Sequence, residues 1–266
     1  MAATIDRNIN DRVFFKVGGE AYFDEGGIWD ENGELWLIPP ADRHYELLTD
    51  DGEQAIEQIA RLWKAEALYK VPGQGGTEKM TSYGVDPISF ANTVWWREDF
   101  SPSPLNALMN SLAQDERALL ADRAFFQDGL LLRIGDPVRF NIAQNDIEFF
   151  IAGWIDTFPT HYPDDGPFVV TNVDFIHRNF GESPWDIIAS LSPGQNAADV
   201  GNQLSTIDVK VVDETDARAE ILEIRTDTTQ TGTFGILSIG FLISTTLTLL
   251  GFLMYSFISF RRRLQE

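Results

Sequence analysis

The feature that most constrains this chain is a long stretch near its C-terminus that carries no charge. No Asp, Glu, Lys or Arg occurs between Gly232 and Phe260. Because an α-helix rises about 1.5 Å per residue, about 20 apolar residues cross the roughly 30 Å hydrocarbon core of a bilayer. The stretch is longer than an ordinary helix of a globular protein, which favours a membrane span over a buried core helix. We therefore predict one transmembrane helix over residues 232–260, in contact with the lipid bilayer.

The charges on either side of this stretch give it a direction. Arg261, Arg262 and Arg263 follow the stretch at once, whereas the segment before it is rich in Asp and Glu. The positive-inside rule places the arginine end of a span in the cytoplasm. We therefore expect residues 261–266 to begin a cytoplasmic part. Residues 1–231 are expected to lie outside the cytoplasm, at the cell membrane.

The overall charge is concentrated in the predicted outer part. The chain has 20 basic and 41 acidic residues, a net charge of −21. Without the last six residues, 17 basic and 40 acidic residues remain, a net charge of −23. This balance argues against a nucleic-acid partner, because phosphate backbones are bound by clustered positive charge. The absence of cysteine excludes disulfides and thiolate metal sites, and 44% hydrophobic content is enough for a buried core.

The two ends of the sequence suggest a longer protein. The first residues lack a basic segment followed by an apolar one, so they do not resemble a secretory signal peptide. Either the C-terminal span alone brings the outer part across the membrane, or an earlier transmembrane helix does so. The ending at Arg-Arg-Arg-Leu-Gln-Glu favours the second interpretation, in which this chain is one piece of a longer protein.

The outer part shows the patterns of both helices and strands. Apolar residues recur at three- and four-residue steps over residues 52–69, which predicts an amphipathic helix. A helix over 215–229 would form a stalk that leads to the span. We predict an α+β domain with a mixed sheet. The other expected elements are strands at 12–17, 34–38, 119–121, 148–155, 185–191 and 207–212, a strand pair over 130–140, a helical turn at 123–127 and a helix at 197–204.

No group of residues carries a recognisable catalytic pattern. His161 precedes Asp164 and Asp165, which would suit a metal or an acid and base. A polar turn at Pro163 explains the same residues without any chemistry, and no second histidine lies at a ligand spacing. We therefore expect no catalytic residue, no metal and no cofactor, and a protein that is not an enzyme.

Two other sets of residues are candidates for contacts. Trp95 and Trp96 are adjacent, and neighbouring positions on a strand point to opposite faces. One of these tryptophans is therefore expected to be exposed to a partner. In the span, small residues recur at steps of four, four and three, which would let another helix pack closely. These helix-packing residues are Gly240, Ser244, Thr248 and Gly251.

Several short motifs, in order along residues 80–266, resemble the FtsX-like (MacB-type) permeases of ABC transporters. The span and its arginines resemble the second transmembrane segment of that family. In the coupling motif R-x-x-E that follows this segment in the family, Arg263 and Glu266 match the two fixed positions. The outer part resembles the family's extracytoplasmic domain at Gly84-Val85-Asp86, at 131–138 and at 150–155. The first 80 residues match less clearly.

The resemblance implies a permease piece with a MacB-like periplasmic core, a stalk and one transmembrane helix. Its partners would be a cytoplasmic ATPase subunit and further transmembrane helices of the same permease. The outer domain would transmit ATP-driven motion to export a lipoprotein or an amphiphile, or to act on an envelope partner. Two alternatives stay open at this point. The first is a single-span sensor or adhesion protein with a ligand-binding outer domain, and the second is a membrane-anchored hydrolase that uses His161 and Asp165.

Overall fold

The structure is a computed structural model that divides into two compact units, Met1–Glu220 and Ile221–Glu266, which are described separately. It describes residues 2–29, 36–37, 39–49, 51–71, 75–142, 145–181, 183–226 and 240–255. The strands are β1 (Ala21–Glu25), β2 (Ile28–Trp29), β3 (Trp36–Leu37), β4 (Ile56–Lys70), β5 (Thr77–Val85), β6 (Ala118–Asp122), β7 (Pro137–Ile142), β8 (Asn145–Ile155), β9 (Phe168–Asn172), β10 (Asp186–Leu191) and β11 (Val211–Asp216). The α-helices are α1 (Ala2–Val17), α2 (Pro87–Thr93), α3 (Leu105–Gln114), α4 (Val173–Phe180), α5 (Ala197–Thr206) and α6 (Ala217–Thr226).

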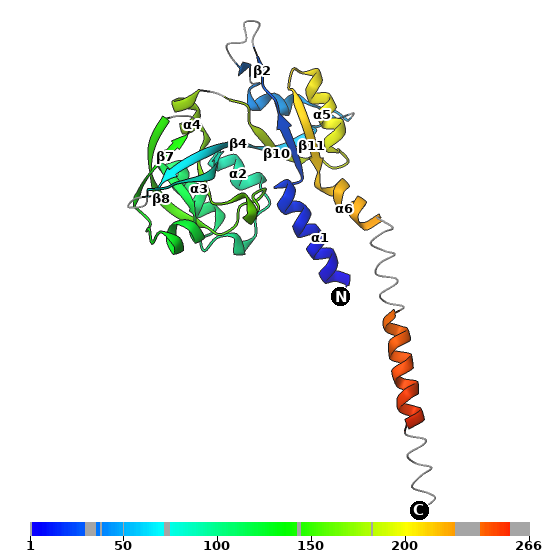
Figure 1. The fold of residues 1–266 in the computed structure, drawn as a ribbon. Helices are drawn as coiled ribbons and strands as arrows, with labels where there is room; N and C mark the ends of the chain where they lie inside the picture. Colours follow the sequence, from blue (N-terminus) through cyan, green and yellow to red (C-terminus); the bar gives the residue numbers. More distant parts are fainter. Residues whose placement is uncertain are drawn as a thin grey trace, which may run out of the picture. The chain divides into compact units, whose positions relative to one another are not determined.

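One mixed sheet organises the larger unit (Figure 1). Its strand order over the described residues is β11-β1-β10-β4-β5-β9-β6-β8-β7. The last strand, β7, also pairs with β4, so the strands from β4 to β7 close into a barrel. The strand β4 is long enough to take part in both the barrel and the open part of the sheet. A small separate sheet consists of β2 and β3.

Three clusters of buried side chains form the core. The first fills the barrel and includes Phe126, Phe140 and Trp154. The second lies where α2 and α3 cover the outside of the barrel, around Tyr83. The third lies between the open part of the sheet and α5, around Phe23. Because β4 contributes residues to all three clusters, it connects the two halves of the sheet.

The predicted α+β class and mixed sheet are confirmed. Strands at 119–121, 148–155 and 185–191 are confirmed as parts of β6, β8 and β10, and the helix at 197–204 as α5. The helical turn predicted at 123–127 is a π-helical turn at Ala124–Gly129. Of the helix predicted at 215–229, residues 217–226 are helical, 215–216 still belong to β11, and 227–229 lie outside the described residues. The strand predicted at 207–212 begins later, at Val211.

Three predicted elements are wrong. The strand expected at 12–17 is the last part of α1, whose aromatic residues pack against a distant loop. The helix expected at 52–69 is strand β4. Its neighbours Ile59 and Ala60 are both buried, in clusters on opposite faces of the sheet, so a strand buried on both sides imitates the spacing of a helix. Of the strand pair expected at 130–140, only the β7 part is a strand.

The C-terminal unit contains an exposed apolar helix. Residues 240–255 are helical, and the remaining residues of the predicted span, 232–239 and 256–260, lie outside the described ones. Within the described ranges, no helix has both the length and the apolar character that a membrane crossing requires. The large apolar side chains of this helix are each at least 54% exposed, and they are Phe241, Leu242, Ile243, Leu247, Leu249, Leu250, Phe252, Leu253, Met254 and Tyr255.

Candidate functional site: the junction of helices α1 and α6

The chain enters and leaves the sheet at one place. Helix α1 ends next to β1, and α6 begins where β11 ends. The strands β1 and β11 are antiparallel neighbours, and Ala21 at the start of β1 pairs with Asp216 at the end of β11. The end of α1 and the first turn of α6 therefore lie at the same edge of the sheet (Figure 1).

Ion pairs join the two helices at this edge. The Nζ of Lys16 lies 2.8 Å and 3.0 Å from the two carboxylate oxygens of Glu220. Just after α1, Glu20 accepts a hydrogen bond of 2.6 Å from Arg218, and its backbone carbonyl accepts one of 2.9 Å from the amide of Ala217. We call these residues, Lys16, Glu20, Arg218 and Glu220 together with Asp216, the helix junction.

Asp216 orders the starts of two helices at the junction. Its Oδ1 accepts hydrogen bonds of 2.8 Å and 3.0 Å from the amides of Arg218 and Ala219, which are in the first turn of α6. Its Oδ2 accepts a bond of 3.0 Å from the amide of Ala197, the first residue of α5. A carboxylate at a helix start accepts hydrogen bonds from free N–H groups and interacts favourably with the helix dipole. Asp216 therefore fixes where the stalk helix begins.

A cluster of aromatic side chains holds the end of α1 against the domain. Phe14 stacks on Trp95 with ring centroids 6.1 Å apart, and Phe15 contacts Phe100 and Tyr162 edge-on at 6.0 Å and 5.4 Å. Arg97 adds an ion pair of 3.0 Å to Asp11 in α1. Such aromatic pairs each contribute about 0.5–1.5 kcal/mol beyond the burial of their area. The helix is therefore anchored by several independent contacts.

A glycine makes the turn between α1 and β1. Gly18 has φ of +81°, and a side chain there would meet Ile188 at 3.0 Å and Thr160 at 3.1 Å. We expect Gly18→Ala to lower the free energy of unfolding by about 1–2 kcal/mol, because the left-handed conformation is unfavourable for a residue with a Cβ. Urea denaturation measures this loss. Gly75→Ala is the control, since nothing lies within 4 Å of its Cβ position, and an equal loss there would contradict the explanation.

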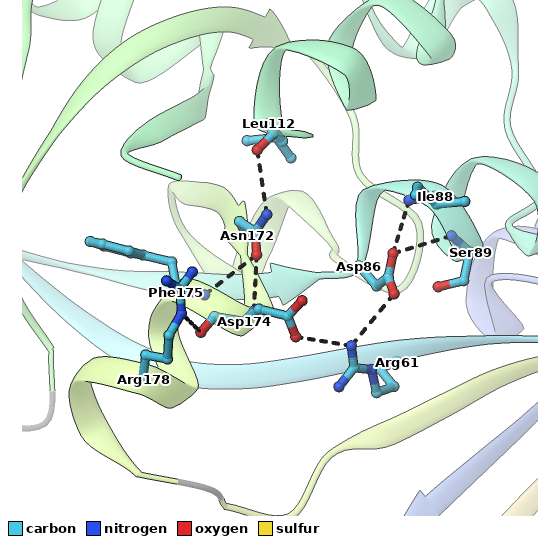
Figure 2. A network of polar contacts seen from close by, with 9 residues as sticks. All are labelled: Arg61, Asp86, Ile88, Ser89, Leu112, Asn172, Asp174, Phe175 and Arg178. Carbon is cyan, nitrogen blue, oxygen red and sulfur yellow. Dashed lines mark hydrogen bonds and ion pairs between the residues drawn. The ribbon is translucent and has the colours of Figure 1, made fainter. Parts of the chain in front are cut away.

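A second polar network joins β4, α2 and α4 (Figure 2). Arg61 on β4 contacts Asp174 at 3.0 Å and Asp86 at 3.5 Å. Asp86 also caps the start of α2 through the amides of Ile88 and Ser89. Through these contacts the network ties β4 to α2 and α4.

The histidine that the sequence singled out is fully engaged in the fold. His161 is buried, with Nδ1 3.1 Å from the hydroxyl of Tyr83 and Nε2 2.8 Å from the carbonyl oxygen of Gly166. The carboxylate of Asp165 accepts a hydrogen bond from the amide of Tyr162 and closes a turn. Among the residues that the structure describes, no group of three or more His, Asp or Glu is arranged to hold a metal ion.

The other predicted site residues lie in three places. Trp95 and Trp96 are half-buried in the aromatic cluster on an irregular loop, so the strand expected for them is wrong, and their partner contact stays a prediction. The helix-packing residues lie on the exposed helix 240–255, where Thr248 donates a hydrogen bond of 2.8 Å to the carbonyl of Ser244 and nothing lies within 4 Å of the Cβ positions of Gly240 and Gly251. The orienting and coupling residues 261–266 lie outside the described residues.

Sequence patterns give no sign of the helix junction. Lys16 and Glu220 are 204 residues apart, and the pattern around Lys16 predicts a strand where the structure has a helix. The sequence shows only one half of the contact between Lys16 and Glu220, namely the acidic residues of the expected stalk. A basic residue at the end of an N-terminal helix would have been the matching signal.

The comparisons with known proteins gave matches among solved structures alone. No family model matches the sequence, and no curated protein matches it significantly. The structure is similar to the periplasmic region of MacB from Actinobacillus actinomycetemcomitans, at 7% identity and a TM-score of 0.48, with 82% of this chain and 98% of that chain covered. It is also similar to the extracellular domain of the noncanonic ABC-type transporter YknZ from Gram-positive bacteria, at 8% identity and a TM-score of 0.41, with 72% of this chain and all of that chain covered.

Proposed function

We propose that residues 1–231 form the extracytoplasmic domain of an ABC transporter permease. In this proposal, the domain transmits ATP-driven motion to export a lipoprotein or an amphiphile, or to act on an envelope partner. The observation that carries the proposal is the helix junction, where α1 and α6 are joined by Lys16 and Glu220 at one edge of the sheet. A movement of either helix acts on the domain at this place.

The sequence after α6 supports a membrane connection for this domain. The exposed helix 240–255 is uncharged and rich in large apolar residues, which is typical of a segment surrounded by protein or by lipid. The arginines that follow the predicted span favour a cytoplasmic position for the C-terminal residues. The chain thus has the parts that a transmitting domain needs, namely a folded outer domain, a stalk helix and an apolar segment.

The proposal gives ATP hydrolysis to a partner subunit. The sequence has no phosphate-binding loop, and His161 and Asp165 make hydrogen bonds within the fold. The partner is a cytoplasmic ATPase subunit, together with further transmembrane helices of the same permease. Purification of the full-length protein from its own membranes should recover an ATPase. Its absence, in a protein with no additional membrane spans, would favour a single-span sensor instead.

The proposed topology gives a labelling prediction. These 266 residues contain no cysteine, so a single introduced cysteine is the only thiol within them. We expect a membrane-impermeant maleimide to label Asp128→Cys, an exposed position, in intact spheroplasts. The matched variant Gln265→Cys should be labelled only after permeabilisation, because the tail is proposed to be cytoplasmic. Labelling of both variants before permeabilisation would disprove the topology.

A second prediction tests the stalk as a rigid lever. Two glycines inserted after Glu223 interrupt α6 beyond the helix junction, and each costs about 1 kcal/mol of helix stability relative to alanine. We expect transport by the full permease to fall strongly while its ATP hydrolysis continues. The control inserts two alanines at the same position, which keeps the helix but changes its phase. Unchanged transport in the glycine variant would argue against the lever.

The junction itself has a charge-reversal test. Exposed ion pairs contribute only about 0–1 kcal/mol to stability, so Lys16→Glu leaves the domain folded. In the proposal this substitution weakens coupling, because the introduced carboxylate would repel Glu220. The double variant Lys16→Glu with Glu220→Lys should recover transport, which a general loss of stability does not explain.

A further inference from the structure

The two strands that carry the helices are joined to the rest of the sheet by one strand pair. Strand β1 follows α1, and β11 precedes α6. In the sheet order, β11 lies at the edge and pairs with β1, and β1 pairs with β10. The pairing of β1 with β10 is therefore the lateral connection between this helix-bearing edge and the remaining strands. We call it the edge join.

A hydrogen bond between two titratable side chains crosses the edge join. The hydroxyl of Tyr22 on β1 donates to Oδ2 of Asp186 on β10, and the contact is partly buried. In the register of these strands, Asp24 lies directly opposite Asp186. Asp24 also lies opposite Asp213 of β11 on its other side. Residues directly opposite in an antiparallel pair have Cβ atoms about 4.5–5.5 Å apart, and like charges at such positions weaken the pairing.

The surroundings of Asp186 favour its neutral form. Burial is the main cause that raises the pKa of Asp186, to about 6, and the negative charges of Asp24 and Glu25 act in the same direction. The hydrogen bond from Tyr22 and the charge of Lys64 oppose this rise. Burial and the charge of Asp186 raise the pKa of Tyr22, so its hydroxyl remains a donor. Two further titratable groups lie near the pair among the described residues, namely Tyr83 and Asp213, which is opposite Asp24.

We propose that Tyr22, Asp186 and Asp24 form a proton-operated latch at the edge join, closed when Asp186 is protonated and loosened when it is ionised. When Asp186 is protonated, it is neutral and does not repel Asp24 on the opposite strand. The hydrogen bond from Tyr22 then connects β1 and β10 without this repulsion. Loss of that proton leaves two carboxylates opposite each other, and the partly buried one is poorly solvated. The latch thus makes the attachment of the helix-bearing edge depend on pH, and this is the pH outside the cytoplasm where the proposed function places the domain.

Hydrogen exchange of the full-length protein, measured at pH 5 and pH 7.5, tests the latch. After correction for the intrinsic exchange rates, the protection of amides in β1 and β11 should fall toward pH 7.5. If Asp186 has an ordinary pKa in the open state, the fall between these two pH values is about tenfold. The amides of β6, inside the barrel, should keep their protection. In Asp186→Asn, the protection of β1 and β11 should not fall between pH 5 and pH 7.5.

Glu57→Gln is the matched control, because it removes an exposed carboxylate from β4, away from the pair. It should show the same pH response as the wild type. Wild-type protection that does not change with pH, or the same change in Asp186→Asn, would overturn the latch. If Asp186→Asn does not fold, Asp24→Asn decides the question: removal of the facing charge should move the midpoint of the exchange change to lower pH, and an unmoved midpoint overturns the proposal.

Discussion

Replacement of Phe126 by alanine is expected to lower the free energy of unfolding by about 3–5 kcal/mol. Phe126 is completely buried and belongs to the cluster that fills the barrel. Its ring lies 5.5 Å from that of Tyr69 on β4 and 6.1 Å from that of Phe140 on β7. Strands β4 and β7 pair with each other and close the barrel. The cavity that alanine leaves would therefore lie next to this strand pair. Urea denaturation followed by tryptophan fluorescence measures the loss.

Phe125→Ala is a control within the same turn. Phe125 is only partly buried, although its ring also contacts those of Tyr69 and Phe126. A smaller loss is expected there, because a half-exposed side chain buries less apolar area and leaves no closed cavity. Equal losses of unfolding free energy in the two variants would contradict the explanation that the complete burial of Phe126 causes the larger loss.

Replacement of Asp186 by asparagine is expected to stabilise the protein at neutral pH. The pKa of Asp186 is raised from an ordinary value of 3.8 to about 6 in the folded state. The folded protein therefore binds this proton more tightly than the unfolded chain, and stability falls as pH rises between these two values. The difference between these two pKa values corresponds to about 3 kcal/mol of unfolding free energy. The wild type no longer has this contribution above pH 6. Asparagine keeps an acceptor for Tyr22 and carries no charge.

The comparison of stabilities across pH isolates this group from the other acids. Both proteins should be denatured by urea at several values between pH 4 and 7.5. The difference in unfolding free energy between Asp186→Asn and the wild type should grow through this range and level off above pH 6. A difference that is constant with pH would mean that Asp186 has an ordinary pKa in the folded state. Asp213→Asn, which removes an exposed carboxylate of the same edge, should give a much smaller change.

Sequence patterns predict best those elements with a single buried face. In α5, Ala197, Val200 and Leu204 are buried on one side, and Asn196 caps the helix, so both the period and the start signal are visible. The strand β4 has no such simple pattern, because different parts of it face different clusters. Helix α1 is not predictable from its own residues, because Phe14 and Phe15 find their partners in the distant residues Trp95 and Phe100.

Of the two helices that meet at the candidate site, only the second is predictable from the sequence. The sequence predicts an acidic helix over 215–229, and the structure has a helix at Ala217–Thr226, whereas its role as a stalk stays a prediction. Its partner Lys16 depends on the pairing of β1 with β11, and no local pattern specifies which strands become neighbours in a mixed sheet. The fold class thus follows from composition and pattern, whereas the place where the two helices meet follows from topology.

The register at the helix junction also determines how the domain resists mechanical load. Helix α1 enters β1 and α6 leaves β11 at the same end of this strand pair, next to Ala21 and Asp216. Since antiparallel hydrogen bonds run perpendicular to the strands, a force that pulls the two helices apart peels these bonds open one at a time. A force that pulls both helices together along the strands loads all the bonds between β1 and β10 at once, in shear. The domain is therefore compliant when the helices separate and stiff when they move as one.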